Sequence, residues 1–361
     1  MSDVFEEIKK KLMESSKGKR VMVLSESEVA QINTWLFTPT YDLNRILSGS
    51  LYKGVAEKTH TLLVGPEASG KSSFMCLNLA AAQKLGYTPI IINAEGAWTA
   101  EFVARWGLDA TKSMVINSST VEDIHRDLAN IKQEGFTKLA IALDSIGALN
   151  SNKVVADADK GDIKADQGSL QKKIKAMMKT MVDIVKFQDS IAFSAGHYYG
   201  NPSGYGDPEQ IGGGKYPRLA ADYIVTLKKQ LIYENPGAKA AARGAVLGTE
   251  IHAATIKNRF APPFQEALFE INYRDGVNAL AGMIAVATDM GLIEKGGSWY
   301  TVPSLDIKVQ GETKLMESLK EKDLAPFLES IETILKSQGY SSQNATLEDE
   351  LGNEPVEETL E

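Results

Sequence analysis

Residues 59–85, THTLLVGPEASGKSSFMCLNLAAAQKL, decide the fold of this chain. Within them, residues 65–72 fit the pattern G-x-x-x-x-G-K-[ST] in full, after a short apolar run at 60–64 and before a helical pattern at 71–85. Glycines let backbone N–H groups turn inward around phosphates, and the N-terminus of the following helix adds a positive dipole. The order strand, loop, helix therefore predicts a phosphate-binding loop at the carboxyl end of a buried strand.

This loop supplies most of the expected contacts to ATP, the expected cofactor together with Mg²⁺. Lys71 is expected to bridge the β- and γ-phosphates, and the Ser72 hydroxyl is expected to hold Mg²⁺. The residues expected around the nucleotide are Gly65, Pro66, Glu67, Ala68, Ser69, Gly70, Lys71, Ser72 and Ser73. A Gly-rich turn in front of a helix is the alternative interpretation, which the flanking strand and helix disfavour.

Two carboxylates end other predicted strands. The run LAIALD ends in Asp144, which we expect to support the metal directly or through water. The run IIINAE ends in Glu95, the candidate general base that would orient the attacking water. Carboxyl ends of parallel strands meet at one edge of an open sheet, so Lys71, Glu95 and Asp144 should converge there. A solvated carboxylate at a strand end is the alternative for Glu95, and spacing alone does not decide between the two.

The wider pattern alternates strands and helices. Helical patterns at 71–85, 121–134 and 169–187 lie between several short apolar runs. These runs are at 60–64, 89–93, 114–117, 139–144, 190–196, 223–227, 253–257 and 267–272. Near-continuous apolar strands joined by helices predict an α/β fold with a mostly parallel central sheet covered on both faces. The last runs lack intervening helices, so an antiparallel extension at one edge is expected.

Four segments are expected along the chain. Residues 1–34 form an N-terminal helix and linker, with Phe5, Ile8 and Leu12 on one apolar stripe that packs on its own domain or on a neighbouring subunit. Residues 35–275 form the ATPase core, and 276–340 form a small α+β C-terminal domain. Residues 341–361 form an acidic tail with few large apolar groups, expected to be disordered.

Composition excludes some classes of protein but leaves nucleic acid open as a partner. No apolar run approaches the length needed to span a bilayer, the N-terminus lacks the apolar region of a secretory signal, and Cys76 is the single cysteine, so we expect a cytoplasmic protein without a membrane partner. The net charge is -8, but seven of the 47 acidic residues lie in the tail. The remaining 40 face 39 basic residues, so local basic patches remain available.

Five segments together resemble the RecA-type strand-exchange recombinases. They are GPEASGKSS, INAEGAW, LAIALDSIGAL, IKNRFAPPF and GLIEKGGSWYT, in the family's order, and the resemblance covers about residues 35–335. It implies a RecA-type P-loop ATPase core with an N-terminal helical arm. It also implies that Glu95 activates water, that Phe102 stacks on adenine, and that Lys257 and Arg259 reach the ATP of the adjacent subunit. A solvated pair of cations at a strand end is the alternative for Lys257 and Arg259.

One position departs from the family's usual pattern. The family has glutamine where this chain has His197 in SAGHYYGN, and that glutamine senses the γ-phosphate and couples it to a DNA-binding loop. A neutral histidine can donate one hydrogen bond in the same way, although an internally satisfied strand-end histidine is the alternative. Gly-His resembles the phage T4-type (UvsX-like) branch, which implies the host cytoplasm, whereas KGGSWYT and IKNRFAPPF look closer to the cellular form.

Two polar, Gly-rich segments, 150–168 and 198–217, correspond to the family's DNA-binding loops and are expected to lack regular structure. The helix after the first segment carries basic residues that can meet phosphates without regard to sequence, and aromatic rings in the second could stack on bases. The candidate DNA-binding residues are Lys172, Lys173, Lys175, Lys179, Tyr198, Tyr199, Gly212, Gly213 and Gly214. A solvated helix face is the alternative for each lysine, and a hinge for the glycines.

These features predict an ATP-dependent DNA recombinase, a DNA-dependent ATPase that forms filaments on single-stranded DNA, pairs it with homologous duplex DNA and exchanges strands in recombination and repair. The expected partners are both forms of DNA and further copies of the chain, with a single-strand-binding protein and a recombination mediator as additional candidates. Two alternatives stay open: a hexameric helicase or motor on the same core, and an ATP-binding accessory protein of recombination.

Overall fold

The computed structural model describes most of the chain. The described residues are 3–15, 23–27, 31–38, 40–160, 167–200, 209–235, 242–274 and 276–338. The expected acidic tail at 341–361 lies outside them, as do parts of the linker and of both expected DNA loops. No helix within these ranges has the length and apolarity needed to cross a membrane.

Two compact units make up the chain. The first contains Met1–Phe37 and Val55–Lys228, and the second contains Thr38–Gly54 and Lys229–Glu361. These units are divided at other positions than the four segments expected from the sequence, and that four-part division remains a prediction.

The first unit is built on a parallel sheet. Its strands lie in the order β8-β1-β5-β4-β2-β3, and each neighbouring pair is parallel. The strands are β1 (His60–Val64), β2 (Thr88–Asn93), β3 (Met114–Ile116), β4 (Leu139–Asp144), β5 (Ile191–Gly196) and β8 (Tyr223–Tyr233). Every residue of β1, β4 and β5 is buried, as near-continuous apolar runs in a doubly covered sheet require. The expected mostly parallel α/β architecture is confirmed.

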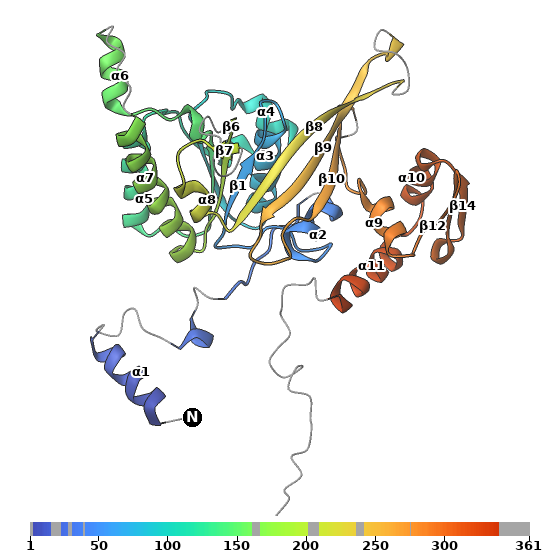
Figure 1. Cartoon of the computed structure of the whole chain (residues 1–361), viewed down its shortest axis with the longest axis horizontal. Coiled ribbons are helices and arrows are strands. Elements are labelled where there is room, and N and C mark those ends of the chain that lie inside the picture. The colour runs from blue at the N-terminus through green and yellow to red at the C-terminus, as the bar shows by residue number, and fades with distance from the viewer. Residues whose placement is uncertain are drawn as a thin grey trace, which may run out of the picture. The chain divides into compact units, whose positions relative to one another are not determined.

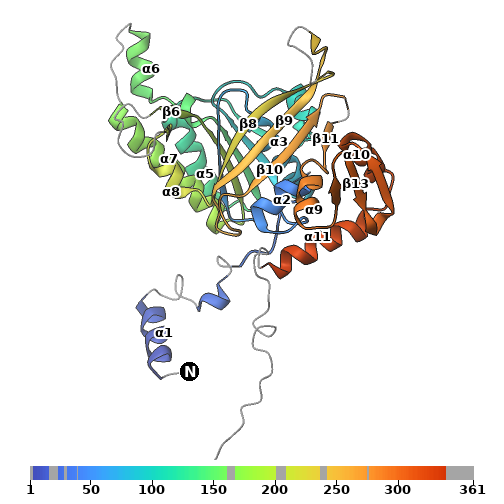
Figure 2. The ribbon, with the colours of Figure 1, turned by 45° about the vertical axis from the view of Figure 1, so that its right-hand side comes forward.

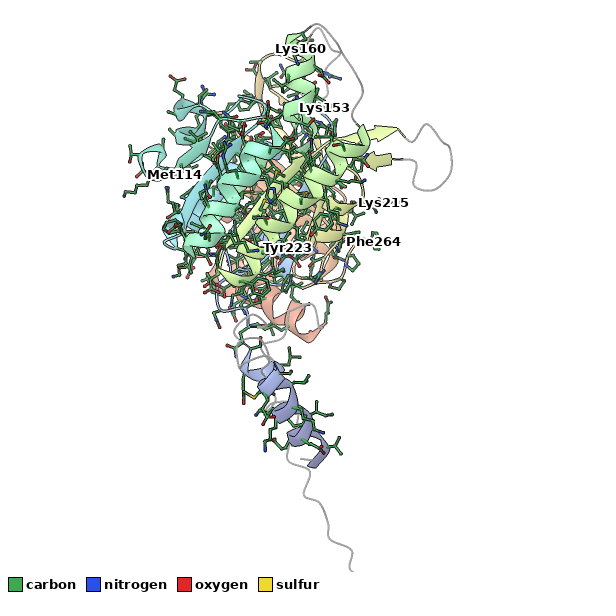
Figure 3. The ribbon with its side chains drawn as sticks, turned by 90° about the vertical axis from the view of Figure 1, so that its left-hand side faces the viewer. Met114, Lys153, Lys160, Lys215, Tyr223 and Phe264 are labelled. Carbon is green, nitrogen blue, oxygen red and sulfur yellow. The ribbon has the colours of Figure 1, made fainter. Side chains whose placement is uncertain are left out.

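Helices cover this sheet in two groups because its crossover connections are right-handed. The chain moves one way along the sheet through α3 (Lys71–Lys84) and α4 (Ala100–Arg105), and returns through α5 (Val121–Glu134), α7 (Gln167–Phe187) and α8 (Tyr216–Ala220). Reversal of direction places the second group on the opposite face from the first. Figure 3 looks onto the face that α5 and α7 cover. Because these strands are parallel, the carboxyl ends of β1, β2, β4 and β5 all lie at one edge of the sheet.

Both expected DNA loops contain regular structure, so the expectation of irregular chain was partly wrong. The first contains helix α6 (Asn152–Asp159), which projects from the sheet unit in Figure 1. The first residue of α6 is held by a side chain of α5, because Asn152 N–H donates to the Glu122 carboxylate at 3.1 Å. The second contains the antiparallel pair β6 (Tyr198–Gly200) and β7 (Glu209–Ile211). These contacts are not local in the sequence, so composition alone did not reveal them.

The N-terminal helix α1 (Asp3–Ser15) carries the expected apolar stripe. Phe5, Ile8 and Leu12 are 41%, 52% and 48% exposed in the single chain. The residues that follow, from 31 to 36, are held on the first unit by backbone hydrogen bonds from Leu36 to Val55 and from Glu57 to Thr34. The helix therefore presents an uncovered apolar surface on a segment whose C-terminal end is anchored.

The second unit has two parts. One contains α2 (Tyr41–Ser48) packed on β9 (Val246–Lys257) and β10 (Glu266–Asn272), with β11 (Gly276–Asn278) at the edge of the order β11-β10-β9-β8. The pairs β9–β10 and β10–β11 are antiparallel, which confirms the expected change of strand direction after 227. Helix α2 was not expected from the sequence.

The other part is a three-stranded antiparallel sheet with helices around it (Figure 2). Its strands are β12 (Glu294–Gly296), β13 (Trp299–Val302) and β14 (Ile307–Gln310), and its helices are α9 (Met283–Asp289), α10 (Glu312–Lys320) and α11 (Ala325–Ser337). One apolar core joins α9, β13, α10 and α11, with Tyr300, Leu315 and Ile331 among its buried members. Leu51, from the segment after α2, belongs to the same core.

A buried carboxylate fixes that segment to α11. Glu332 is 4% exposed and accepts hydrogen bonds from the Ser50 hydroxyl and the Leu51 N–H, both at 2.7 Å. The Leu51 N–H is a fixed backbone donor, so its loss of an acceptor inside the protein is costly.

We predict that Glu332→Leu destabilises the protein by about 1–3 kcal/mol, because an apolar side chain leaves the buried Leu51 N–H without an acceptor. Urea denaturation followed by circular dichroism measures the effect. Glu329→Leu on the exposed face of the same helix is the matched control, expected to change stability by less than about 0.5 kcal/mol. Equal stabilities for the two variants would contradict the anchoring role of Glu332.

Candidate nucleotide site

The segment between β1 and α3 forms a tight loop. Ala68 and Gly70 have positive φ angles of 56° and 95°. A Cβ atom on Gly65 would collide with the carbonyl oxygen of Leu227 and lie 2.7 Å from Ser69 Oγ, so only glycine fits there. Pro66, Glu67 and Ala68 are exposed, whereas Ser69 and Lys71 are buried. The loop therefore keeps an open outer rim around a buried amine.

Lys71 points its amine back into this loop. Its Nζ atom donates to the carbonyl oxygens of Gly65 at 3.0 Å and Pro66 at 2.7 Å. Burial lowers the pKa of Lys71, an effect that the charges of Asp144, Glu95 and Glu67 oppose. A buried cation beside open backbone is suited to bind phosphate oxygens, which are better acceptors than the two carbonyls because they carry charge.

The expected metal ligands lie side by side. The Ser72 hydroxyl, in the first turn of α3, donates to Asp144 Oδ2 at the end of β4 over 2.6 Å. Burial raises the pKa of Asp144, although hydrogen bonds from Ser72 and Trp98 oppose that rise. A hydroxyl and a carboxylate fit Mg²⁺, which prefers oxygen ligands and usually retains water and phosphate in its shell. In the described ranges there is no cluster of three or more His, Cys, Asp or Glu residues suited to a metal.

Glu95 reaches the same edge from β2. Its backbone N–H donates to the carbonyl oxygen of Asp144 at 3.2 Å, and its carboxylate accepts a short hydrogen bond from the Ser145 hydroxyl. His197, directly after β5, places Nε2 3.7 Å from Glu95 Oε1. The side chains of Glu95 and His197 are 39% and 27% exposed, so both can meet a ligand. The carboxyl edge of the sheet thus brings together Lys71, Glu95 and Asp144, whose convergence was expected from the sequence, and adds His197 beside Glu95.

An aromatic row lies beside this edge of the sheet. The ring of Phe102 is half-buried and lies between two indoles, 5.4 Å from Trp98 and 6.3 Å from Trp106, with edge-to-face geometry in both contacts. The Trp98 indole N–H also donates to Asp144 Oδ2 at 2.8 Å. Sequence reasoning chose Phe102 and missed Trp98. The spacing of four residues between successive rings was a signal for the row, but nothing local indicated a bond to a residue 46 positions away.

Lys257 and Arg259 lie in the second compact unit, at and just beyond the end of β9. Asn258, between them, donates to the carbonyl oxygens of Ile46 at 2.9 Å and Leu47 at 3.1 Å. Its side-chain oxygen accepts the N–H of Phe260 at 2.8 Å. The turn that carries both cations is therefore fixed to the end of α2, a role for Asn258 that the sequence did not reveal.

The candidate lysines of α7 differ in their surroundings. Lys172, Lys175 and Lys179 are exposed, whereas Lys173 pairs with Glu122 of α5 at 2.8 Å. The Lys175 amine also lies 5.9 Å from the centre of the Tyr216 ring. Lys172 and Lys179 are therefore the most available of the four for phosphate contacts. Helix α6 adds Lys153, and Lys160 follows directly after its last residue; both are exposed and are labelled in Figure 3.

The two ends of the second loop meet beside His197. Gly212 N–H donates to the His197 carbonyl oxygen at 3.2 Å, and Tyr198 pairs with Ile211 across β6 and β7. Gly213 and Gly214 have φ angles of 87° and 85°. A Cβ atom on Gly213 would collide with Ile146, so this glycine packs against the core as well as allowing the turn. Tyr199 lies in β6, but its side chain and residues 201–208 fall outside the described part.

Comparison with known proteins identifies the family. Residues 2–278 match the model of the RecA N-terminal domain. Protein RecA of Nitratidesulfovibrio vulgaris (strain DP4) is 28% identical over 283 residues, which cover 78% of this chain and 76% of that protein. Protein RecA of Bordetella petrii is 27% identical over 319 residues, covering 85% of this chain and 84% of that protein. The mitochondrial DNA repair protein recA homolog of Dictyostelium discoideum is 26% identical over 295 residues, which cover 80% of this chain and 62% of that protein.

The family match spans well over half of the chain, and the relatives extend the similarity beyond the phosphate loop to most of the length of both bacterial proteins. The expected RecA-type fold is confirmed, and this chain belongs to the RecA family.

Proposed function

We propose that this chain is an ATP- and Mg²⁺-dependent DNA recombinase. It assembles on single-stranded DNA, pairs that strand with homologous duplex DNA and exchanges strands in recombination and repair. At the level of the family, RecA proteins are DNA-dependent ATPases that use ATP and Mg²⁺ and form filaments on DNA. The activity of this particular chain is the proposal, and it rests on the residues at its own nucleotide site.

One observation carries the proposal: a buried lysine, a serine–aspartate pair and an exposed glutamate converge at one sheet edge, with a histidine 3.7 Å from that glutamate. Lys71, Ser72 and Asp144 suit a nucleoside triphosphate with its metal, since phosphates require a cation such as lysine and Mg²⁺ requires oxygen ligands. The glutamate is the additional group that hydrolysis requires. A protein that only bound ATP would have no use for that glutamate, which disfavours the accessory-protein alternative.

In the proposed reaction, Lys71 holds the terminal phosphates and Ser72 and Asp144 hold Mg²⁺, which neutralises phosphate charge when bound. Glu95 orients the attacking water and accepts its proton. The hydroxyl of Ser145 and the imidazole of His197 limit the positions that the Glu95 carboxylate can take. Because His197 is followed directly by β6, a change at the γ-phosphate has a short covalent route to the second loop.

ATP also joins neighbouring subunits in this proposal. Phe102 stacks on adenine, while Lys257 and Arg259 of one subunit act on the ATP of the next, where a cation stabilises charge as phosphate is transferred. The turn fixed by Asn258 supports this role, because a defined position is needed for such contacts. The uncovered stripe of α1 supports packing of the N-terminal arm on a neighbour, and an open filament over a closed helicase ring.

DNA is held by many weak contacts along the filament. Lysines of α7, tyrosines of the second loop and glycines at its base supply phosphate and stacking contacts that do not depend on sequence. A few contacts per subunit become strong when they are summed over linked subunits, and they weaken as salt rises.

Several finer assignments belong to the same proposal. The histidine at 197 favours the phage T4-type (UvsX-like) branch, and a single-strand-binding protein and a recombination mediator are further partners. Residues 1–34 act as the oligomerisation arm, 35–275 as the ATPase core and 276–340 as the C-terminal domain. The tail at 341–361 competes with DNA for basic surface or binds a basic partner, with a plain solubility tail as the alternative.

A strand-exchange assay tests the function directly. With a circular single strand and a homologous linear duplex, we predict joint molecules and exchanged products only when ATP and Mg²⁺ are present. Lys71→Ala should abolish both products and ATP turnover, because the phosphates lose their buried cation. Pairing by the unaltered protein without homology, or unwinding of duplex without a homologous strand, would instead favour the motor alternative.

A second prediction separates binding from chemistry. Glu95→Gln keeps the shape of the side chain but removes the base, so nucleotide and DNA binding should persist while DNA-stimulated ATP turnover falls about 10²–10⁴-fold. Glu101→Gln, an exposed change in the first turn of α4, is the control and should hydrolyse ATP at the parental rate. Parental turnover by Glu95→Gln would show that another group activates the water.

A further inference from the structure

The indole of Trp98 contacts the Asp144 carboxylate at the end of β4. Its indole N–H donates to Asp144 Oδ2 at 2.8 Å, and that same oxygen accepts the Ser72 hydroxyl at 2.6 Å. We propose that Trp98 is a positioning residue that orients the Asp144 carboxylate for the Mg²⁺–nucleotide complex and so sets the affinity for Mg²⁺. The inference deepens the proposed function and rests on it.

The indole is held from several directions. Trp98 is 8% exposed, and its backbone N–H donates to the Asn93 side-chain oxygen at 3.3 Å. Asn93 in turn donates to the side-chain oxygen of Asn117 at 3.0 Å. On its other side the indole meets the edge of Phe102, whose backbone N–H is bonded to Thr99 at 3.1 Å. A ring restrained this closely presents its N–H group in one direction.

The two residues that bond to Trp98, Asn93 and Asp144, belong to neighbouring strands. Asn93 and Asp144 lie opposite each other in the register of β2 and β4. Trp98 bonds to the first through its backbone and to the second through its ring. It therefore fixes the end of β4 relative to the end of β2, from which Glu95 also departs. Trp98 therefore helps to position both Asp144, the candidate metal ligand, and the strand end from which Glu95, the candidate base, departs.

The chemistry of the indole suits this task. An indole N–H only donates and carries no charge, so it can support a carboxylate without competing with the metal as a second cation would. Lys71 is less suited to this task than the indole, because phosphates can draw its amine away from the loop carbonyls. A hydrogen bond to an ionised acceptor in a buried site is also stronger than one between neutral groups. Outer groups that orient metal ligands typically change metal affinity by about 10–100-fold when they are removed.

Trp106 offers a matched control within the same row. It touches the other side of Phe102, and its indole nitrogen is buried without a hydrogen-bond partner in the described structure. Replacing either tryptophan by phenylalanine removes one indole N–H and keeps an aromatic ring. Only the change at position 98 removes a hydrogen bond to Asp144.

The experiment measures binding of a fluorescent ATP analogue to the full chain while Mg²⁺ is titrated, and repeats the measurement in EDTA. For Trp98→Phe we expect the Mg²⁺ midpoint to rise about tenfold or more, with affinity in EDTA within about twofold of the parent. Maximal ATP turnover should recover at saturating Mg²⁺, because the ligands themselves remain. Trp106→Phe should match the parent in all these measurements.

Several results would overturn the inference. One is an unchanged Mg²⁺ midpoint in a folded Trp98→Phe protein; another is an equal loss of affinity with and without Mg²⁺, which would indicate a purely structural role. If Trp98→Phe fails to melt cooperatively, benzothienylalanine at position 98 replaces the N–H by sulfur in the same ring shape, and the same shift is required of it. If the unaltered chain binds the analogue without any dependence on Mg²⁺, the proposed function fails, and the role of Trp98 fails with it.

Discussion

The hydrogen bond between the Ser72 hydroxyl and the Asp144 carboxylate joins the first turn of α3 to the end of β4. Much of the site depends on where that bond lies. The phosphate loop ends at Ser72, the strand pairing of β4 with β2 brings Glu95 alongside, and β5 on the other side brings His197. A parallel sheet with right-handed connections forces these strand ends to one edge, so chemistry is concentrated there by topology rather than by nearness in the sequence.

That arrangement has a cost in stability. Asp144 and Lys71 are 3% and 6% exposed. Burial raises the pKa of Asp144 and lowers the pKa of Lys71, which in both cases favours the neutral form. Charged groups held out of water are destabilising unless they are well paired. Here the amine of Lys71 donates to two backbone carbonyls and to Ser69 Oγ, and the Asp144 carboxylate accepts from Ser72 and Trp98, all uncharged partners. A bound nucleotide with Mg²⁺ would add groups of opposite charge, so ligand binding is expected to stabilise the first unit.

The sequence predicted the parts of the fold whose pattern is local. The strands β1, β4 and β10 and the helices α3, α5 and α7 lie within two residues of their expected bounds, because each is a continuous apolar or helical run. It missed α6, whose first residue is held by Glu122 from elsewhere in the chain, and the β6–β7 pair, which forms within a polar segment. Strand β9 is longer than expected, since only its last residues form a continuous apolar run. At the site, residues of recognisable motifs were found, whereas Trp98 and Asn258 act through tertiary contacts that no motif contains.

In the proposed filament, an ATP shared between neighbouring subunits gives Lys257 and Arg259 their role, and packing on a neighbour covers the apolar stripe of α1. Sedimentation velocity with electron microscopy of the same samples tests it, using the full chain, a non-hydrolysable ATP analogue, Mg²⁺ and single-stranded oligonucleotide. The account predicts long helical filaments when all components are present and their loss when the analogue is withheld. A chain that remains monomeric with nucleotide and DNA present, or that forms only closed rings, would contradict it.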